Sequence, residues 1–144
     1  ANNKELENFY PAFKAVKDYV VQAPEKTTGW YLPSIGQWYD FTANLGGLPS
    51  WDDAINEGND LTPNLYRWSN QTELVSKINA YFEPLGTGNY DAIPNGSYQK
   101  FFSSSTYSDS GIWTWFVGKQ ANVVQCWHNV RYNSDSAVRP ILAF

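Results

Sequence analysis

The fold of this chain is decided by residues 101–144, FFSSSTYSDSGIWTWFVGKQANVVQCWHNVRYNSDSAVRPILAF. After Gly96 the apolar residues recur with a period of about two, which is the period of a strand with two different faces. Strands are therefore predicted over Tyr98–Ser104, Ile112–Val117, Asn122–Trp127 and Ala137–Leu142. Turn-forming residues separate them at Ser108–Gly111, Gly118–Gln120 and Asn133–Asp135. The stretch predicts a small antiparallel sheet.

Before this stretch the apolar period is about 3.6, which is typical of helices. The apolar face of a first helix is predicted to consist of Leu6, Phe9, Phe13, Val16 and Val20. Pro11 falls inside that pattern, so the helix proper should begin there, with proline in its first turn. Pro24 and Gly29 bracket the loop that follows, and Trp30–Leu32 has the composition of a short strand.

The clearest helix start is Ser34, because Gln37 lies three residues later and completes a capping box. The inward stripe of this helix is Ile35, Trp38, Tyr39, Thr42 and Leu45, and Gly46-Gly47 ends it. Leu48–Trp68 shows no regular period and is predicted to be irregular.

A further helix is predicted from Gln71 to Phe82, with Asn70 and Glu73 as its capping pair. Its apolar face consists of Leu74, Val75, Ile78, Tyr81 and Phe82, and Pro84 and Gly86 end it. Helices followed by a separate antiparallel sheet make an α+β domain.

Composition limits the organisation and the partners. The chain has 144 residues, enough for one domain with a single core, and no low-complexity stretch offers a linker. A net charge of −4 without a basic patch argues against a nucleic-acid partner. No apolar run approaches the roughly 18 residues of a membrane span, so membrane insertion by this domain is not expected. Because methionine is absent, residues 1–144 are expected to be the C-terminal part of a longer protein.

Three segments together resemble a known family. Gly29-Trp-Tyr-Leu-Pro-Ser34 opens a helix, Phe102-Ser-Ser-Ser-Thr-Tyr-Ser108 precedes a strand with Trp113, and Val138-Arg-Pro-Ile-Leu-Ala-Phe144 closes the chain. This order is similar to that of the C-type-lectin-like domains of bacterial surface and phage proteins, including those varied by diversity-generating retroelements. The resemblance runs from about Phe9 to the end of the chain. It implies a C-type-lectin-like fold that binds a ligand.

The resemblance also implies which residues carry binding, because the family presents substitutable side chains on a fixed frame. The frame would be Trp113, Trp115, Val117, Val123, Arg139 and Pro140. The ligand-binding positions would be Thr114, Phe116, Lys119, Gln125, Trp127, His128, Asn129, Tyr132 and Asp135.

Strand periodicity favours the same division. Trp113, Trp115 and Val117 face one side of a strand, and Thr114 and Phe116 face the other. If the first set packs inward, Phe116 is an exposed aromatic ring. Aromatic rings surrounded by hydrogen-bonding groups, as around Trp127, are typical of a recognition surface. The alternative is that Phe116, Trp127 and Tyr132 form a second small core under a loop.

Catalysis and metal binding are not expected. The one histidine excludes a multi-histidine metal site, and the one cysteine, Cys126, excludes the cysteine pair of the related formylglycine-generating fold. Cys126 is predicted to be a buried small residue, with a reactive thiol as the alternative. The acidic residues Asp52, Asp53, Glu57 and Asp60 lack the ligand spacing of a calcium site. Arg139 is predicted to be structural, paired with an acid or a backbone carbonyl.

The expected function is non-enzymatic ligand binding, as an adhesin or receptor-recognition domain at a cell surface or on a virion, without cofactors. The partner would be a protein or a glycan on another cell, phage or host surface. One alternative is a carbohydrate-binding module that uses exposed Trp and Tyr rings. The other is a structural spacer domain of a surface protein.

Overall fold

The computed structural model describes residues 10–47, 66–69, 71–86, 88, 91–95, 99–118, 123–130 and 136–143. At residues 66–69, 71, 118, 123–125 and 127–130 it describes the backbone alone. The predicted turns at Gly118–Gln120 and Asn133–Asp135 lie wholly or largely outside these ranges, as do Leu6, Phe9 and the acidic residues 52–60.

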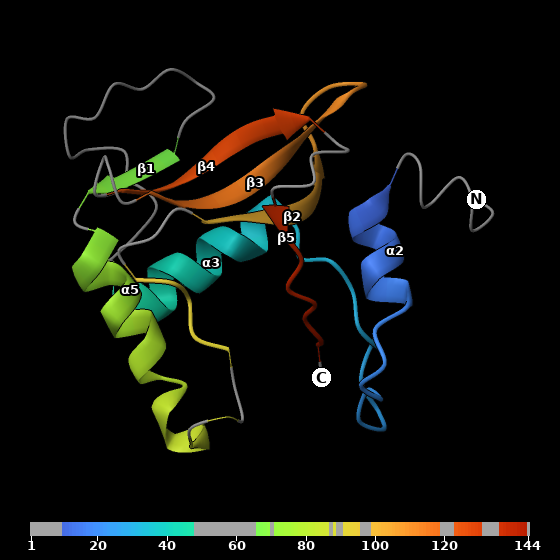
Figure 1. Ribbon diagram of the computed structural model, residues 1–144, viewed down its shortest axis with the longest axis horizontal. Coiled ribbons are helices and arrows are strands. Elements are labelled where there is room, and N and C mark those ends of the chain that lie inside the picture. The colour runs from blue at the N-terminus through green and yellow to red at the C-terminus, as the bar shows by residue number, and fades with distance from the viewer. Residues whose placement is uncertain are drawn as a thin grey trace.

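The chain forms one mixed sheet with helices packed against it, which confirms the α+β class (Figure 1). The strands are β1 (Tyr66–Ser69), β2 (Gln99–Thr106), β3 (Gly111–Gly118), β4 (Val123–Val130) and β5 (Ser136–Ala137), in the spatial order β1-β4-β3-β2-β5. The neighbouring pairs are antiparallel except β2 and β5, which run parallel. The prediction of a wholly antiparallel sheet was therefore wrong at β5. That strand is not joined to β2 by a hairpin, so no tight turn sets its direction.

The β2–β3 hairpin was predicted closely. Its turn covers 107–110, where the N–H groups of Tyr107 and Ser108 both donate to the Gly111 carbonyl. β1 was missed, because its four residues are too few to show a period and lie at the end of a stretch predicted to be irregular. The last predicted strand, Ala137–Leu142, forms a regular strand only at its start, in β5, and pairs again near its end at a Tyr31–Ile141 bridge.

Helix α2 (Pro11–Lys17) begins at the predicted proline, with Tyr10 as its N-cap. Its buried residues are Ala12 and Val16, one helical turn apart, whereas Phe13 is exposed. Val20 is exposed as well, because the helix has already ended at Lys17. The predicted apolar stripe was thus correct at Val16 and wrong at Phe13 and Val20.

Helix α3 (Ile35–Gly46) has the predicted capping box. The Ser34 side chain accepts from the Gln37 N–H at 3.1 Å, and the Gln37 side chain accepts from the Ser34 N–H at 2.9 Å. Its inward stripe is also confirmed, with Trp38, Tyr39 and Thr42 fully buried. Gly47 follows with φ of +69°, a left-handed conformation in which glycine avoids the steric penalty of a side chain.

Helix α5 (Gln71–Ala80) packs against α3 and is followed by the short 3₁₀ helix η1 (Glu83–Leu85). Leu74, Val75 and Ile78 are buried as predicted. Tyr81 is 60% exposed, because α5 ends before it, so its assignment to the apolar face was wrong.

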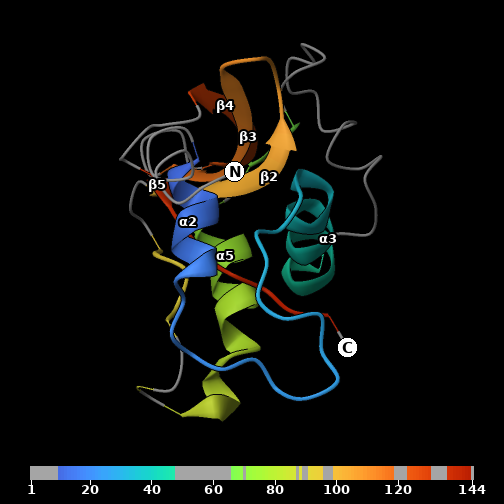
Figure 2. The same ribbon diagram turned by 90° about the vertical axis from the view of Figure 1, so that its right-hand side faces the viewer.

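The sheet carries a core on each face. On the face covered by α3 and α5, the central core consists of Trp38, Tyr39, Leu74, Val75, Ile78, Ile93, Phe101, Trp115, Val117 and Cys126. On the other face, a smaller core consists of Ala12, Val16, Leu32, Phe102 and Ile112. Figure 2 shows α2 and α3 on opposite sides of the molecule below the strands. Because the consecutive residues Phe101 and Phe102 point to opposite faces, both faces are apolar at this strand.

Candidate ligand-binding cleft

Two of the predicted contact residues lie inside the protein. Thr114 is 0% exposed and Phe116 is 9% exposed, so neither can present its side chain to a ligand. The reason is the second core, because β3 is covered on both faces rather than on one. For Phe116 the core alternative is correct, and the simple alternation of a half-exposed strand does not apply.

The side chains of the other predicted contact residues are not described, so their role in binding stays a prediction. Gln125, Trp127, His128 and Asn129 belong to β4, whose backbone pairs with β3 so that Thr114 lies opposite Trp127 and Trp113 lies opposite His128. Lys119, Tyr132 and Asp135 lie outside the described residues. In the predicted frame, Trp115 and Val117 are buried and Trp113 is partly buried.

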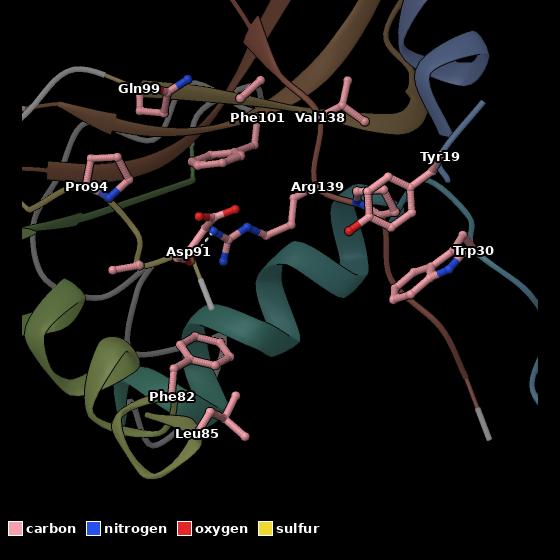
Figure 3. Close-up of a pocket in the computed structure, with 13 residues that line it drawn as sticks. Tyr19, Trp30, Phe82, Leu85, Asp91, Pro94, Gln99, Phe101, Val138 and Arg139 are labelled. Atoms are coloured by element: carbon pink, nitrogen blue, oxygen red, sulfur yellow. Dashed lines mark hydrogen bonds between the residues drawn. The ribbon is translucent and has the colours of Figure 1, made fainter. Parts of the chain in front are cut away.

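A cleft of about 590 Å³ opens beside the sheet, on the side of the C-terminal segment (Figure 3). Its lining comes from five parts of the chain: the loop after α2, the end of α5 with η1, the segment 91–94, β2, and the segment 137–140. The lining residues are Tyr19, Trp30, Phe82, Leu85, Asp91, Ala92, Pro94, Gln99, Phe101, Ala137, Val138, Arg139 and Pro140. A cleft of this size, with a largely apolar wall and a few polar groups, is a candidate binding pocket.

Aromatic rings form one wall of the cleft. Tyr19 and Trp30 meet edge to face, with ring centroids 5.2 Å apart and planes at 87°. The Trp30 Nε1–H donates to the Val21 carbonyl at 2.6 Å, which fixes the orientation of the indole. Tyr19 remains 43% exposed, so a large ring faces solvent on a supported wall.

The opposite wall is formed by Phe82 and Leu85, and Leu85 is 56% exposed. The neighbouring segment is held against α5 by Asn79, whose side chain donates to the Ile93 carbonyl and accepts from the Ile93 N–H, both at 2.8 Å. Ile93 itself is buried in the central core. These paired, partly buried contacts fix the position of the segment 91–94 beside this wall.

Arg139 lies between the walls, close to Asp91 (Figure 3). It donates from Nη2 to the Asp91 backbone carbonyl, as the predicted structural role requires. Its guanidinium also lies over the Phe101 ring, 5.6 Å from the centroid. Burial lowers the pKa of Arg139, and the negative charge of Asp91 partly opposes that effect.

Sequence reasoning missed this cleft because its residues have no common local pattern. Tyr19 and Trp30 follow α2, Phe82 and Leu85 follow α5, and Arg139 is near the C-terminus. The one local signal of a surface site was weak: the aromatic residue Tyr19 directly follows two charged residues, Lys17 and Asp18, at the end of α2.

Cys126 is fully buried in the central core, as predicted. Burial raises the pKa of its thiol, against a smaller lowering from a hydrogen bond with the Tyr39 side chain. The buried thiol therefore stays protonated and inert at neutral pH.

Reagent access to Cys126 checks this assignment. At pH 8 the folded domain should not react with 5,5′-dithiobis(2-nitrobenzoic acid), whereas the domain in concentrated urea should react fully. Because the folded state keeps the proton to higher pH, the domain should lose stability as the pH rises above the ordinary thiol pKa of about 8.5. Rapid labelling of the folded domain, with unchanged circular dichroism, would contradict the burial of this residue.

Among the described residues, no group of three or more His, Cys, Asp or Glu side chains is placed to hold a metal ion. In the same part of the chain, no helix has both the length and the apolar character to cross a membrane.

Comparison with protein-family models, with curated proteins and with solved structures finds no match for this chain.

Proposed function

We propose that this chain is a non-enzymatic recognition domain with a C-type-lectin-like fold, displayed at a cell surface or on a virion, and that its ligand occupies the cleft between Tyr19–Trp30 and Phe82–Leu85. The observation that carries the proposal is the cleft itself. The exposed Tyr19 ring is supported there by the half-buried Trp30 ring, near the Arg139 guanidinium.

The fold assignment is supported by the three segments on which the family resemblance rests, because they meet in space. The Ser104 N–H donates to the Pro33 carbonyl at 2.8 Å, and the Ile35 N–H donates to the Ser105 hydroxyl at 2.9 Å. Tyr31 and Ile141 exchange backbone hydrogen bonds of 3.0 and 2.9 Å. Motifs that are far apart in the chain thus form one structural unit.

Recognition is supported by the chemistry of the cleft walls. Exposed large apolar groups cost solvation free energy, and clusters of them commonly mark interaction sites. Tyr and Trp give large contact areas with little loss of side-chain entropy, which is why they serve as anchors in binding surfaces. The cleft residues described here carry no obvious nucleophile with an adjacent base, so binding is the function that they suit.

In this proposal the C-terminal residues contribute to binding in two places. Segment 137–140 lines the cleft, and the predicted contact residues between 119 and 135 are proposed as further contacts for a protein partner. If the chain is diversified by a retroelement, the varied positions belong to this second surface. A protein ligand is favoured because the cleft is open and mainly apolar.

Binder selection tests the proposal. A displayed random 12-residue peptide library and a glycan array are probed with the wild-type domain and with a Tyr19→Ala/Leu85→Ser variant. Selected ligands should bind the variant at least tenfold more weakly, a loss of about 1.4 kcal/mol. Tyr81→Ala is the matched control, because Tyr81 is an exposed tyrosine that does not line the cleft.

The outcomes separate the alternatives. Peptide binders that depend on Tyr19 and Leu85 support the proposal. Glycan binding that is lost in Tyr19→Ala favours the carbohydrate-binding alternative, which the exposed Tyr19 ring makes chemically reasonable. Binders that are unaffected by the cleft substitutions would contradict the proposal. The absence of any binder would also contradict it and would fit a structural spacer domain.

A further inference from the structure

We propose that the cleft binds the C-terminal residue of a peptide, with its carboxylate on the Arg139 guanidinium and its bulky apolar side chain between the aromatic walls. This inference rests on the proposed function and specifies the ligand of the same cleft.

The first argument is the number of hydrogen-bond donors on Arg139. A guanidinium carries five N–H donors in a planar fork and has no acceptor. In the part of the chain that the structure describes, the Arg139 side chain makes one hydrogen bond, to the Asp91 backbone carbonyl, and no ion pair with a carboxylate. Most of its donor capacity is therefore available to a ligand.

The second argument is the environment of the charge. Arg139 is partly buried, and the Phe101 ring covers one side of the guanidinium at 5.6 Å. Burial has removed part of its hydration, which lowers the pKa, and the Asp91 charge offsets this cost in part. A partly desolvated cation with unused donors gains from an ionised acceptor, and an arginine edge binds a carboxylate through two parallel hydrogen bonds.

The third argument is the chemistry around the charge. Apolar walls stand on both sides of Arg139, from Tyr19 and Trp30 and from Phe82 and Leu85 (Figure 3). The ligand must therefore carry a bulky apolar group close to its carboxylate. A C-terminal residue meets both requirements alone, because its carboxylate and its side chain share one Cα.

Charge limits the ligand to a single carboxylate. Asp91 lies beside Arg139 and repels a second negative group, and the chain has a net charge of −4. Polyacidic ligands should therefore bind poorly. A C-terminal Phe or Leu after neutral residues is the expected sequence.

The test uses three peptides: acetyl-Gly-Gly-Phe with a free carboxylate, the same peptide with a C-terminal amide, and acetyl-Gly-Asp-Phe amide, in which the acid is internal. Binding to the intact domain is measured from chemical-shift changes on titration. The free acid should bind at least tenfold more tightly than either amide. Equal affinity for the acid and its simple amide, or for the internal acid, would overturn the inference.

Substitutions of Arg139 locate the effect. Arg139→Gln should remove the preference for the free acid, and Arg139→Lys should keep part of it, because lysine retains the charge but loses the planar fork. Thermal unfolding of each variant checks that the fold is retained. If Arg139→Gln does not fold, two results decide the matter: the acid-to-amide ratio of the wild type, and weaker binding of both peptides with an unchanged ratio in Tyr19→Ala.

Failure of this inference and failure of the proposed function look different. If library-selected peptides require Tyr19 and Leu85 but show no preference for a free C-terminal carboxylate, the cleft is a binding site of another specificity. In that case the proposed function stands and the present inference is wrong.

Discussion

Replacing Trp115 with alanine is expected to lower the free energy of unfolding by about 3–5 kcal/mol, the range typical for removal of a buried Trp or Phe ring. The indole is fully buried and stacks on Trp38, with ring centroids 4.9 Å apart and planes 3° apart. Its Nε1–H donates to the Thr42 hydroxyl at 2.8 Å, and Thr42 in turn donates to the Trp38 carbonyl at 2.7 Å. The substitution therefore leaves both a cavity and an incomplete hydrogen-bond chain.

Urea unfolding followed by circular dichroism measures this effect. A loss of that size is a large part of the 5–15 kcal/mol that stabilises a typical domain, so the midpoint of unfolding should move to a clearly lower urea concentration. Trp113→Ala is the matched control, because Trp113 is on the same strand but only partly buried, and its ring meets Tyr107 edge to face. Equal losses from the two substitutions would contradict the central role of Trp115.

Gly46→Ala should destabilise the domain by about 1–3 kcal/mol through overpacking, although alanine is the better helix former. Gly46 lies in the last turn of α3, where α5 packs closely. A Cβ at this position would lie 2.1 Å from Leu74 Cδ1 and 3.3 Å from its Cγ. Because Leu74 is itself buried in the central core, it has little room to move away.

Gly36→Ala is the control for Gly46→Ala. Gly36 is in the same helix, is exposed, and has no atom closer to its added Cβ than the Ser34 hydroxyl at 3.7 Å. This control should be neutral or stabilising by up to about 1 kcal/mol. In urea unfolding, the double variant Gly46→Ala/Leu74→Ala should lose less stability than the sum of the single variants, since the smaller side chain removes the clash. Strict additivity would show that the two residues are not in steric conflict.

The parts of the fold that depend on local chemistry were predictable. Ser34 and Gln37 form the capping box that their spacing implies, and Pro11 begins its helix because proline suits the first turn. The strands β2, β3 and β4 were found because their apolar residues have the period of a strand. In each case the sequence signal lies within one short stretch of the chain.

The parts that depend on tertiary packing were not predictable. Alternation divides β3 correctly into two faces, but it does not show that α2 and the adjoining chain cover the second face, so Thr114 and Phe116 were placed in solvent. β5 pairs with β2 in parallel although the two strands are far apart in the chain, and no local turn records that pairing. The cleft brings Tyr19 and Arg139 together, and their separation in the chain leaves no sequence pattern.

Chemical-shift mapping of a library-selected peptide on the ¹⁵N-labelled domain tests the central claim most directly. Recognition in the cleft predicts the largest changes at the Trp30 indole N–H and at the backbone amides of Tyr19, Leu85 and Arg139. A separate groove lies between α3 and α5 and is lined by residues that include Leu45, Lys77 and Tyr81. The amides of that groove should be unaffected. Largest changes at that groove, with an unchanged Trp30 indole signal, would contradict the account.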